Sequence, residues 1–368
     1  MRFLYQKWSD RFNSNSDKPV FDRLMDLFRE LLYISSGDVS QALKWLTELD
    51  KEYKLTEAEE DYSIAEFIRE LEERGFIKYD PDTVEVVITK KTELQLRRHA
   101  LDEIFKNLDK GKSGQHKTNY SGKGNERESD TRKWQFGDDI HHIDNTATLL
   151  NALKHSGPDH LSLSEDDLEV HETDHQTSVA TVLMIDLSHS MVLYGEDRIT
   201  PAKKVAMALS ELILSSYSKD SLDIVAFGND VWPVSIDELP YLKVGPYHTN
   251  TQAGLQLARH TLQRRKHTNK QIFMITDGKP SAMFENGKLY KNSFGLDRKI
   301  VNRVLDEAVK CRRERIKITT FMIASDPYLQ NFVRELTKAN KGRAYFSQLD
   351  DLGGFVFEDY VRNRKKRI

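Results

Sequence analysis

Apolar positions in the second half of the chain follow two alternating periods. Short β-branched runs fit strands, and apolar residues spaced three and four apart fit helices. The predicted strands are 179–185, 221–228, 270–276, 316–323 and 343–347. The predicted helices are 199–217, 251–265, 297–314, 326–340 and 350–364. This alternation predicts an α/β domain with a doubly wound, mainly parallel sheet covered by helices on both faces.

The beginning of the chain has a different, mainly helical pattern. FDRLMDLFRELLY places Phe21, Leu24, Leu27, Phe28 and Leu31 on one helical face. Two further helical segments, QALKWLTELDKEY and SIAEFIRELEE, are followed by Gly75, the strand-like VEVVIT and a long amphipathic segment. This order fits a winged-helix-like module, and it fits a helical bundle with a short hairpin equally well. We therefore expect a smaller helical N-terminal domain over 1–109.

Between these two regions, residues 110–133 are rich in glycine and in Lys and Arg, with few apolar side chains. A segment of this composition cannot bury enough surface to order itself, so we expect a flexible basic linker. Residues 134–178 then form a connecting segment that packs on the α/β domain, which itself occupies 179–368. This division is the domain organisation that the sequence predicts.

Oxygen-bearing side chains follow the predicted strands at three places. TVLMIDLSHSM delivers Asp186, Ser188 and Ser190, and KQIFMITDGKPS delivers Asp277. HTNTQAGL supplies Thr249 just before a helix. In open α/β sheets the carboxyl ends of the strands form the ligand-binding edge. Carboxylates and hydroxyls without Cys or His suit Mg²⁺ or Mn²⁺, although the same residues also cap helices in many loops.

Composition narrows the class of protein further. The 368-residue chain is 31% charged and 38% hydrophobic with a net charge of −3, which does not suit coating nucleic acid or an anionic membrane. Its single cysteine, Cys311, excludes an intramolecular disulfide. The N-terminus has no apolar core of a signal peptide, and no apolar run approaches a membrane span. We therefore expect a cytoplasmic protein without a membrane partner.

Two further motifs have simpler interpretations. HETDH at 171–175 matches a zinc-protease motif, but its surroundings predict an extended chain, in which the two histidines could not share one metal ion. Asp138, Asp139, His141, His142 and Asp144 could form a metal cluster. A polar helix start is the favoured interpretation of that segment.

The D-x-S-x-S motif, the Thr and the ITDG motif, in this order, resemble the metal-ion-dependent adhesion site (MIDAS) of von Willebrand factor type A (vWA) domains. From WQFGDD to the C-terminus, the chain resembles a family of uncharacterised cytosolic bacterial vWA proteins. The resemblance implies that Ser188, Ser190 and Thr249 bind Mg²⁺ directly, and that Asp186 and Asp277 hold it through waters. It also implies an accessory role beside a AAA+ ATPase of the MoxR or magnesium-chelatase type.

The function expected from these observations is a metal-dependent protein-interaction adaptor, not an enzyme. Its partner would donate an Asp or Glu to the ion. Two alternatives stay open at the level of sequence. One is a nucleic-acid-binding regulator that uses the N-terminal domain, and the other is a metal-dependent hydrolase.

Overall fold

The structure is a computed structural model of the 368-residue chain. It describes residues 19–56, 62–81, 85–110, 131–134, 143–157, 162–171, 178–195, 197–245, 247–277, 279–292, 295–323, 326–346 and 352–364. The expected linker at 110–133 lies almost wholly outside the described residues.

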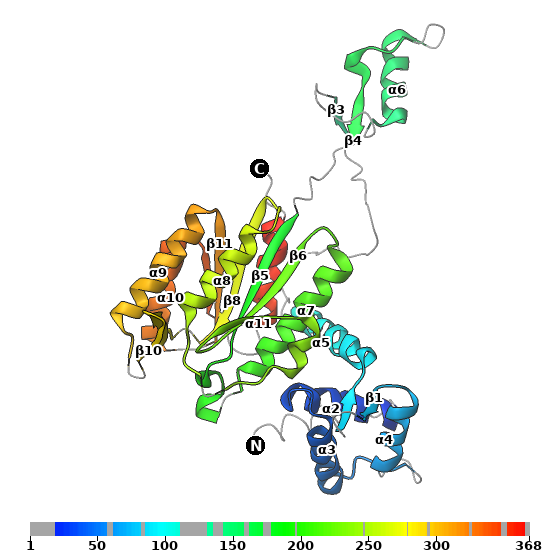
Figure 1. Ribbon diagram of the computed structural model, residues 1–368. Coiled ribbons are helices and arrows are strands. Elements are labelled where there is room, and N and C mark those ends of the chain that lie inside the picture. The colour runs from blue at the N-terminus through cyan, green and yellow to red at the C-terminus, as the bar shows by residue number, and fades with distance from the viewer. Residues whose placement is uncertain are drawn as a thin grey trace. The chain divides into compact units, whose positions relative to one another are not determined.

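A six-stranded sheet forms the centre of the larger part of the molecule (Figure 1). Its strands are β5 (Val179–Asp186), β6 (Ser221–Phe227), β7 (Val231–Val234), β8 (Asn269–Thr276), β11 (Ile316–Met322) and β12 (Arg343–Phe346). The order is β12-β11-β8-β5-β6-β7, and every neighbouring pair is parallel except β6 with β7. The predicted mainly parallel α/β sheet is confirmed, and β7 is an antiparallel edge strand that the sequence did not predict.

Helices cover both faces of this sheet. Successive side chains of a strand point to opposite sides, and β5 is buried at every residue, so apolar side chains face both layers of helices. The helices are α7 (Ile199–Ser216), α8 (Thr251–Gln263), α9 (Arg298–Arg313), α10 (Pro327–Asn340) and α11 (Leu352–Arg364). Val182 and Met184 of β5 share a core with α8, α9 and α10. Leu183 and Ile185 of the same strand share a core with α7 and α11. Two 3-10 helices, η3 (His189–Gly195) and η4 (Ile236–Tyr241), lie in the connections.

A small antiparallel hairpin lies just after β8. It consists of β9 (Ala282–Glu285) and β10 (Lys288–Lys291), joined at Asn286 and Gly287, which both have positive φ. Two residues of positive φ are what the tightest hairpin turns require. This hairpin was not predicted from the sequence, although the Asn-Gly pair is a recognisable signal for it.

The N-terminal part contains helices and one hairpin. The elements are α2 (Val20–Ile34), α3 (Val39–Tyr53), α4 (Ile64–Glu73), β1 (Ile77–Asp80), β2 (Glu85–Ile88) and α5 (Lys90–Lys110). β1 and β2 are antiparallel, so the helix-hairpin-helix order is as expected. Phe28 and Phe67 pack in the same continuous hydrophobic core as Leu209 of α7. The N-terminal helices and the sheet accordingly form one compact unit.

Residues 112–177 form a second compact unit. Its described elements are β3 (Thr131–Lys133), α6 (Asn145–Ser156), η2 (Glu165–Asp167) and β4 (Glu169–His171), and β3 pairs antiparallel with β4. Asp144 caps α6 by accepting hydrogen bonds from two backbone amides, as the helix-start interpretation predicts. Residues 138–142 and 172–175 lie outside the described residues, whereas His171 ends a strand.

None of the described helices is long and apolar enough to cross a bilayer. Cys311 lies buried on α9 as a free thiol, and burial raises its pKa to about 12.

Candidate metal centre

The residues of the predicted metal site lie at one edge of the sheet. Asp186 is the last residue of β5, and Asp277 directly follows the neighbouring strand β8. These two strands are parallel and central in the sheet, so their carboxyl ends meet at the same edge. This edge is the place where open α/β sheets bind ligands.

Asp186 is fully buried and hydrogen-bonded at both carboxylate oxygens. The Ser188 backbone N–H donates to Oδ1 at 2.9 Å, and the Thr276 hydroxyl donates to Oδ2 at 2.6 Å. Burial raises the pKa of this carboxyl to about 7, and the nearby negative charge of Asp277 contributes to the increase. Two carboxylates that repel each other in a buried site are stabilised by a cation between them.

The two serines lie together in the loop that follows Asp186. Their hydroxyl oxygens are 3.0 Å apart; Ser188 is buried and Ser190 half-buried. His189 lies between them in sequence and is exposed. Its backbone N–H donates to Tyr247 O at 3.0 Å, which ties this loop to the one that carries Thr249.

Thr249 is buried. It joins its own loop, which precedes α8, to the loop after β8 that begins with Asp277. Its N–H donates to Ser281 Oγ at 2.9 Å, and its carbonyl accepts from Ser281 N at 3.0 Å and from Ala282 N at 3.1 Å. Because Ser281 follows Asp277 by only four residues, these bonds hold Thr249 against the loop of that carboxylate. All three predicted loops are therefore tied together at one edge.

Three residues that support this arrangement were missed in the sequence. Thr276 bonds to Asp186, Ser281 fixes Thr249, and Asn250 caps α8 by accepting from Ala253 N at 3.1 Å. Thr251 is the first residue of this helix and does not cap it. A hydroxyl at the end of an otherwise apolar strand was the available signal for Thr276.

The residues at this edge fit a hard divalent cation. They offer two carboxylates and three hydroxyls, all of them oxygen donors, from three loops that backbone hydrogen bonds hold together. Asp186 has a raised pKa because it lacks solvent and faces a like charge, and a cation would offset both effects. The fit rests on this donor set and on the electrostatics of the buried carboxylate.

Comparison with known proteins agrees with this fold. Residues 179–361 match the family model described as "Rv0959-like protein, vWA domain", and residues 126–173 match "Rv0959-like protein, third domain". Uncharacterized protein Rv0959 of Mycobacterium tuberculosis is 31% identical over 314 residues, which are 83% of this chain and 46% of that protein. Uncharacterized protein Mb0984 of Mycobacterium bovis matches to the same extent. The chain thus spans about half the length of these relatives.

Solved structures with more distant similarity include two bacterial pilus proteins. The vWF domain of the pili tip protein Mfa5 from Porphyromonas gingivalis is 13% identical, with a TM-score of 0.45 over 52% of this chain and 98% of that chain. The pilus adhesin SpaC from Lactobacillus rhamnosus GG is 17% identical, with a TM-score of 0.39 over 51% of this chain and 30% of that chain. On the family match and the topology of its sheet, this chain contains a vWA domain, over residues 179–361.

Proposed function

We propose that this protein is a metal-dependent protein-interaction adaptor that holds Mg²⁺ or Mn²⁺ at the sheet edge and binds an acidic residue of a partner. The observation that supports this most is the environment of Asp186. Its carboxylate is fully buried beside Asp277, and its pKa is raised to about 7. A resident cation is the simplest way to stabilise two such charges together.

The donor set leaves room for a partner's carboxylate. Mg²⁺ takes six ligands in a near-ideal octahedron and usually retains several waters. With Ser188, Ser190 and Thr249 in direct contact, and Asp186 and Asp277 bonded through waters, at least one water position faces outward. Because the ligands in direct contact with the ion are neutral hydroxyls, the ion would stay electrophilic enough to attract an Asp or Glu.

The partner that we propose is a AAA+ ATPase, in which case the chain would act in the cytoplasm as an accessory protein. This part of the proposal comes from the resemblance to vWA proteins that work beside such ATPases. The ATPase would supply the energy, and the metal-bearing domain would select or connect a target.

The two alternative functions have less support. In the described part of the chain no carboxylate bonds the imidazole of His248 beside Thr249, so this histidine lacks the orienting partner that a general base of a hydrolase usually has. A winged-helix regulator would insert α4 into DNA. That helix has the sequence IAEFIRELEE, whose four glutamates and single arginine would repel the phosphates.

A pull-down from native lysate, read by mass spectrometry, tests the adaptor proposal. Wild-type protein with Mg²⁺ should retain a AAA+ ATPase, and either EDTA or Asp186→Ala should release it. Asp306→Ala is a matched control, because Asp306 is an exposed carboxylate on α9. Equal recovery of the ATPase with and without EDTA would refute the role of the metal. Recovery of nucleic acid alone would favour the regulator.

A further inference from the structure

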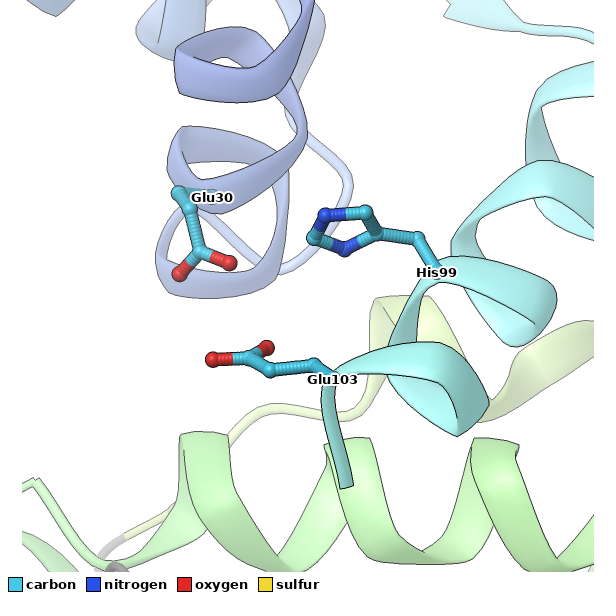
Figure 2. A group of neighbouring side chains, drawn as sticks. All are labelled: Glu30, His99 and Glu103. Carbon is cyan, nitrogen blue, oxygen red and sulfur yellow. The ribbon is translucent and has the colours of Figure 1, made fainter. Parts of the chain in front are cut away.

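A second group of metal-ligating side chains lies away from the sheet edge, among the helices. Glu30 comes from α2, while His99 and Glu103 come from α5. One ligand atom from each of the three residues lies within 4.8 Å of the other two. His99 and Glu103 are four residues apart on a helix, so they share one face. Figure 2 shows the imidazole and the two carboxylates directed toward a common space.

The imidazole of His99 has an unsatisfied nitrogen in this cluster. Its Nδ1 is sealed from solvent and has no hydrogen-bond partner among the described residues. Burial lowers the pKa of His99, and a neutral imidazole has a lone pair for a metal ion. The ring also stacks on Tyr33, with centroids 6.4 Å apart, which restrains its orientation.

Lys204 shows that a cation is stable between the two carboxylates. Its Nζ donates to both carboxylate oxygens of Glu30 at 2.8 Å and to Glu103 Oε2 at 2.9 Å. This lysine belongs to α7, and 16% of its side chain is exposed, so it has a route to solvent. A divalent ion would bring more charge than the ammonium. It would also bind Nδ1 of His99, which has no hydrogen-bond partner among the described residues.

We propose that Glu30, His99 and Glu103 bind a first-row transition-metal dication, with Zn²⁺ as the favoured ion, and that this ion displaces the Lys204 ammonium. One imidazole nitrogen with two carboxylates is a ligand set for Zn²⁺, Co²⁺ or Fe²⁺, whereas Mg²⁺ prefers oxygen alone. The two carboxylates neutralise the ion, and the released Lys204 keeps its charge in water. Three protein ligands leave a fourth position for water.

The location of this site suggests what the ion would do. α2 and α5 belong to the N-terminal part and α7 to the vWA domain, and all three share one compact unit. The ion would tie α2 to α5 directly while releasing the two ion pairs that Lys204 of α7 makes with Glu30 and Glu103; the pairs of Arg97 and Arg98 with Glu211 of α7 would stay. Metal binding would therefore remove the Lys204 contacts between the N-terminal part and the vWA domain. It would add a link between two helices of the N-terminal part.

The test uses the full chain with Asp186→Ala, so that the sheet-edge site cannot contribute and failure of the adaptor proposal has no bearing on the result. Chelator-treated protein is titrated with Co²⁺ and followed by visible d–d absorption, and Zn²⁺ is then added as competitor. We expect one Co²⁺ per chain, displaced by Zn²⁺. His99→Gln and Glu103→Gln should each weaken binding by about 100-fold or more, since loss of a ligand exceeds typical outer-shell effects. His260→Gln, which changes an exposed histidine on α8, should not alter binding.

Lys204→Met is expected to bind Co²⁺ more tightly than the Asp186→Ala protein with Lys204 intact. Tighter binding cannot be explained by a variant that fails to fold. Removing the competing ammonium should tighten Co²⁺ binding by about tenfold or more, the size of outer-shell effects at metal sites. Zn²⁺ should also raise the Tm of the Asp186→Ala protein and leave that of Asp186→Ala/Glu103→Gln unchanged. Unaltered binding in His99→Gln, or weaker binding in Lys204→Met, would overturn the proposal. So would the absence of any bound Co²⁺ in the Asp186→Ala protein.

Discussion

Asp186 illustrates how the surroundings of one residue decide between a structural and a functional role. An Asp after a strand often serves only to cap the next turn, and Asp186 does accept the Ser188 N–H in this way. Its second oxygen accepts from Thr276, and its charge faces Asp277 in a site without solvent. A cap alone does not require a second buried carboxylate, so the pair favours a cation site.

The first prediction concerns binding of the ion at this site. Calorimetric titration of chains that also carry Glu103→Gln, which removes a ligand of the proposed site among the helices, should show weak Mn²⁺ binding with the sheet-edge site intact and none with Asp186→Ala, Thr249→Ala or Asp277→Ala. These side chains follow strands or lie in loops at the sheet edge, so their loss removes ligands without opening the hydrophobic core. Far-ultraviolet circular dichroism should stay unchanged. Equal Mn²⁺ binding by these chains with and without Asp186→Ala would refute the assignment.

A second prediction tests whether the hydrogen bond that orients Asp186 contributes to metal binding when the carboxylate itself is kept. Thr276→Val keeps the shape of the side chain but removes the hydroxyl that donates to Asp186 Oδ2. Mn²⁺ affinity should fall by about 10- to 100-fold, as is typical when a partner that orients a metal ligand is lost. Thr276→Ser should restore most of it, because the donor returns. If Thr276→Val binds Mn²⁺ as the wild type does, the hydroxyl has no part in the site.

At the residue scale, the sequence predicted the proposed ligands better than their supports. Asp186 ends a strongly apolar strand, and Ser188 and Asp277 lie just after such strands, so their place at the sheet edge follows from chain pattern alone. Asn250, Thr276 and Ser281 act through hydrogen bonds to residues in other loops. Such bonds depend on which loops become neighbours, and a single sequence does not contain that information.

Whole elements were predictable where their hydrophobic pattern was long. The predicted strand at 270–276 and helix at 199–217 agree with β8 and α7 to within one residue at each end. β7 was missed because it is four residues long and contains Pro233, which argues against a strand except at a sheet edge. The β9–β10 hairpin was missed because its four-residue strands carry little periodicity, although the Asn286-Gly287 turn marks it.

At the scale of a helix, the start of α8 offers a third prediction. Asn250 is fully buried, caps the helix through Ala253 N, and donates to Asn229 O at 3.2 Å. Asn250→Ala should therefore lower the free energy of unfolding by about 1–2 kcal/mol, the upper range for a lost cap. Thr251→Ala should cost less, since Thr251 does not cap the helix. Urea unfolding measures both, and a larger loss in Thr251→Ala would contradict the observed cap.

On the scale of the whole molecule, the N-terminal helices and the vWA domain are joined by buried polar contacts as well as by a shared core. Lys203 of α7 has only 1% of its surface exposed, and its Nζ donates to Tyr33 O at 2.9 Å, to Ser36 Oγ at 3.0 Å and to Leu242 O at 3.3 Å. Two of these acceptors belong to the N-terminal part. The sequence does not indicate this role, because a lysine in a helical pattern is normally interpreted as an exposed surface residue.

The last prediction uses Lys203 to measure this junction. Burial lowers the pKa of Lys203 from 10.5 to about 8. Between these two values the unfolded chain holds a proton that the folded chain has lost, so stability increases with pH in this window. Below pH 8 both states are protonated, and the full cost of burying the charge remains. The contribution of Lys203 should therefore rise by about 1.4 kcal/mol for each pH unit above 8, up to about 3 kcal/mol in all.

Lys203→Met supplies the reference, because it keeps the aliphatic length and cannot titrate. The quantity to measure is the difference in unfolding free energy between wild type and Lys203→Met, from urea curves at pH 7.5, 8.5 and 9.5. Tyrosines and other lysines titrate in both proteins, so their effects cancel in this difference. The difference should shift in favour of the wild type as pH rises. A constant difference would mean that Lys203 keeps an ordinary pKa in the folded chain, and hence that water reaches the junction between the N-terminal helices and the vWA domain.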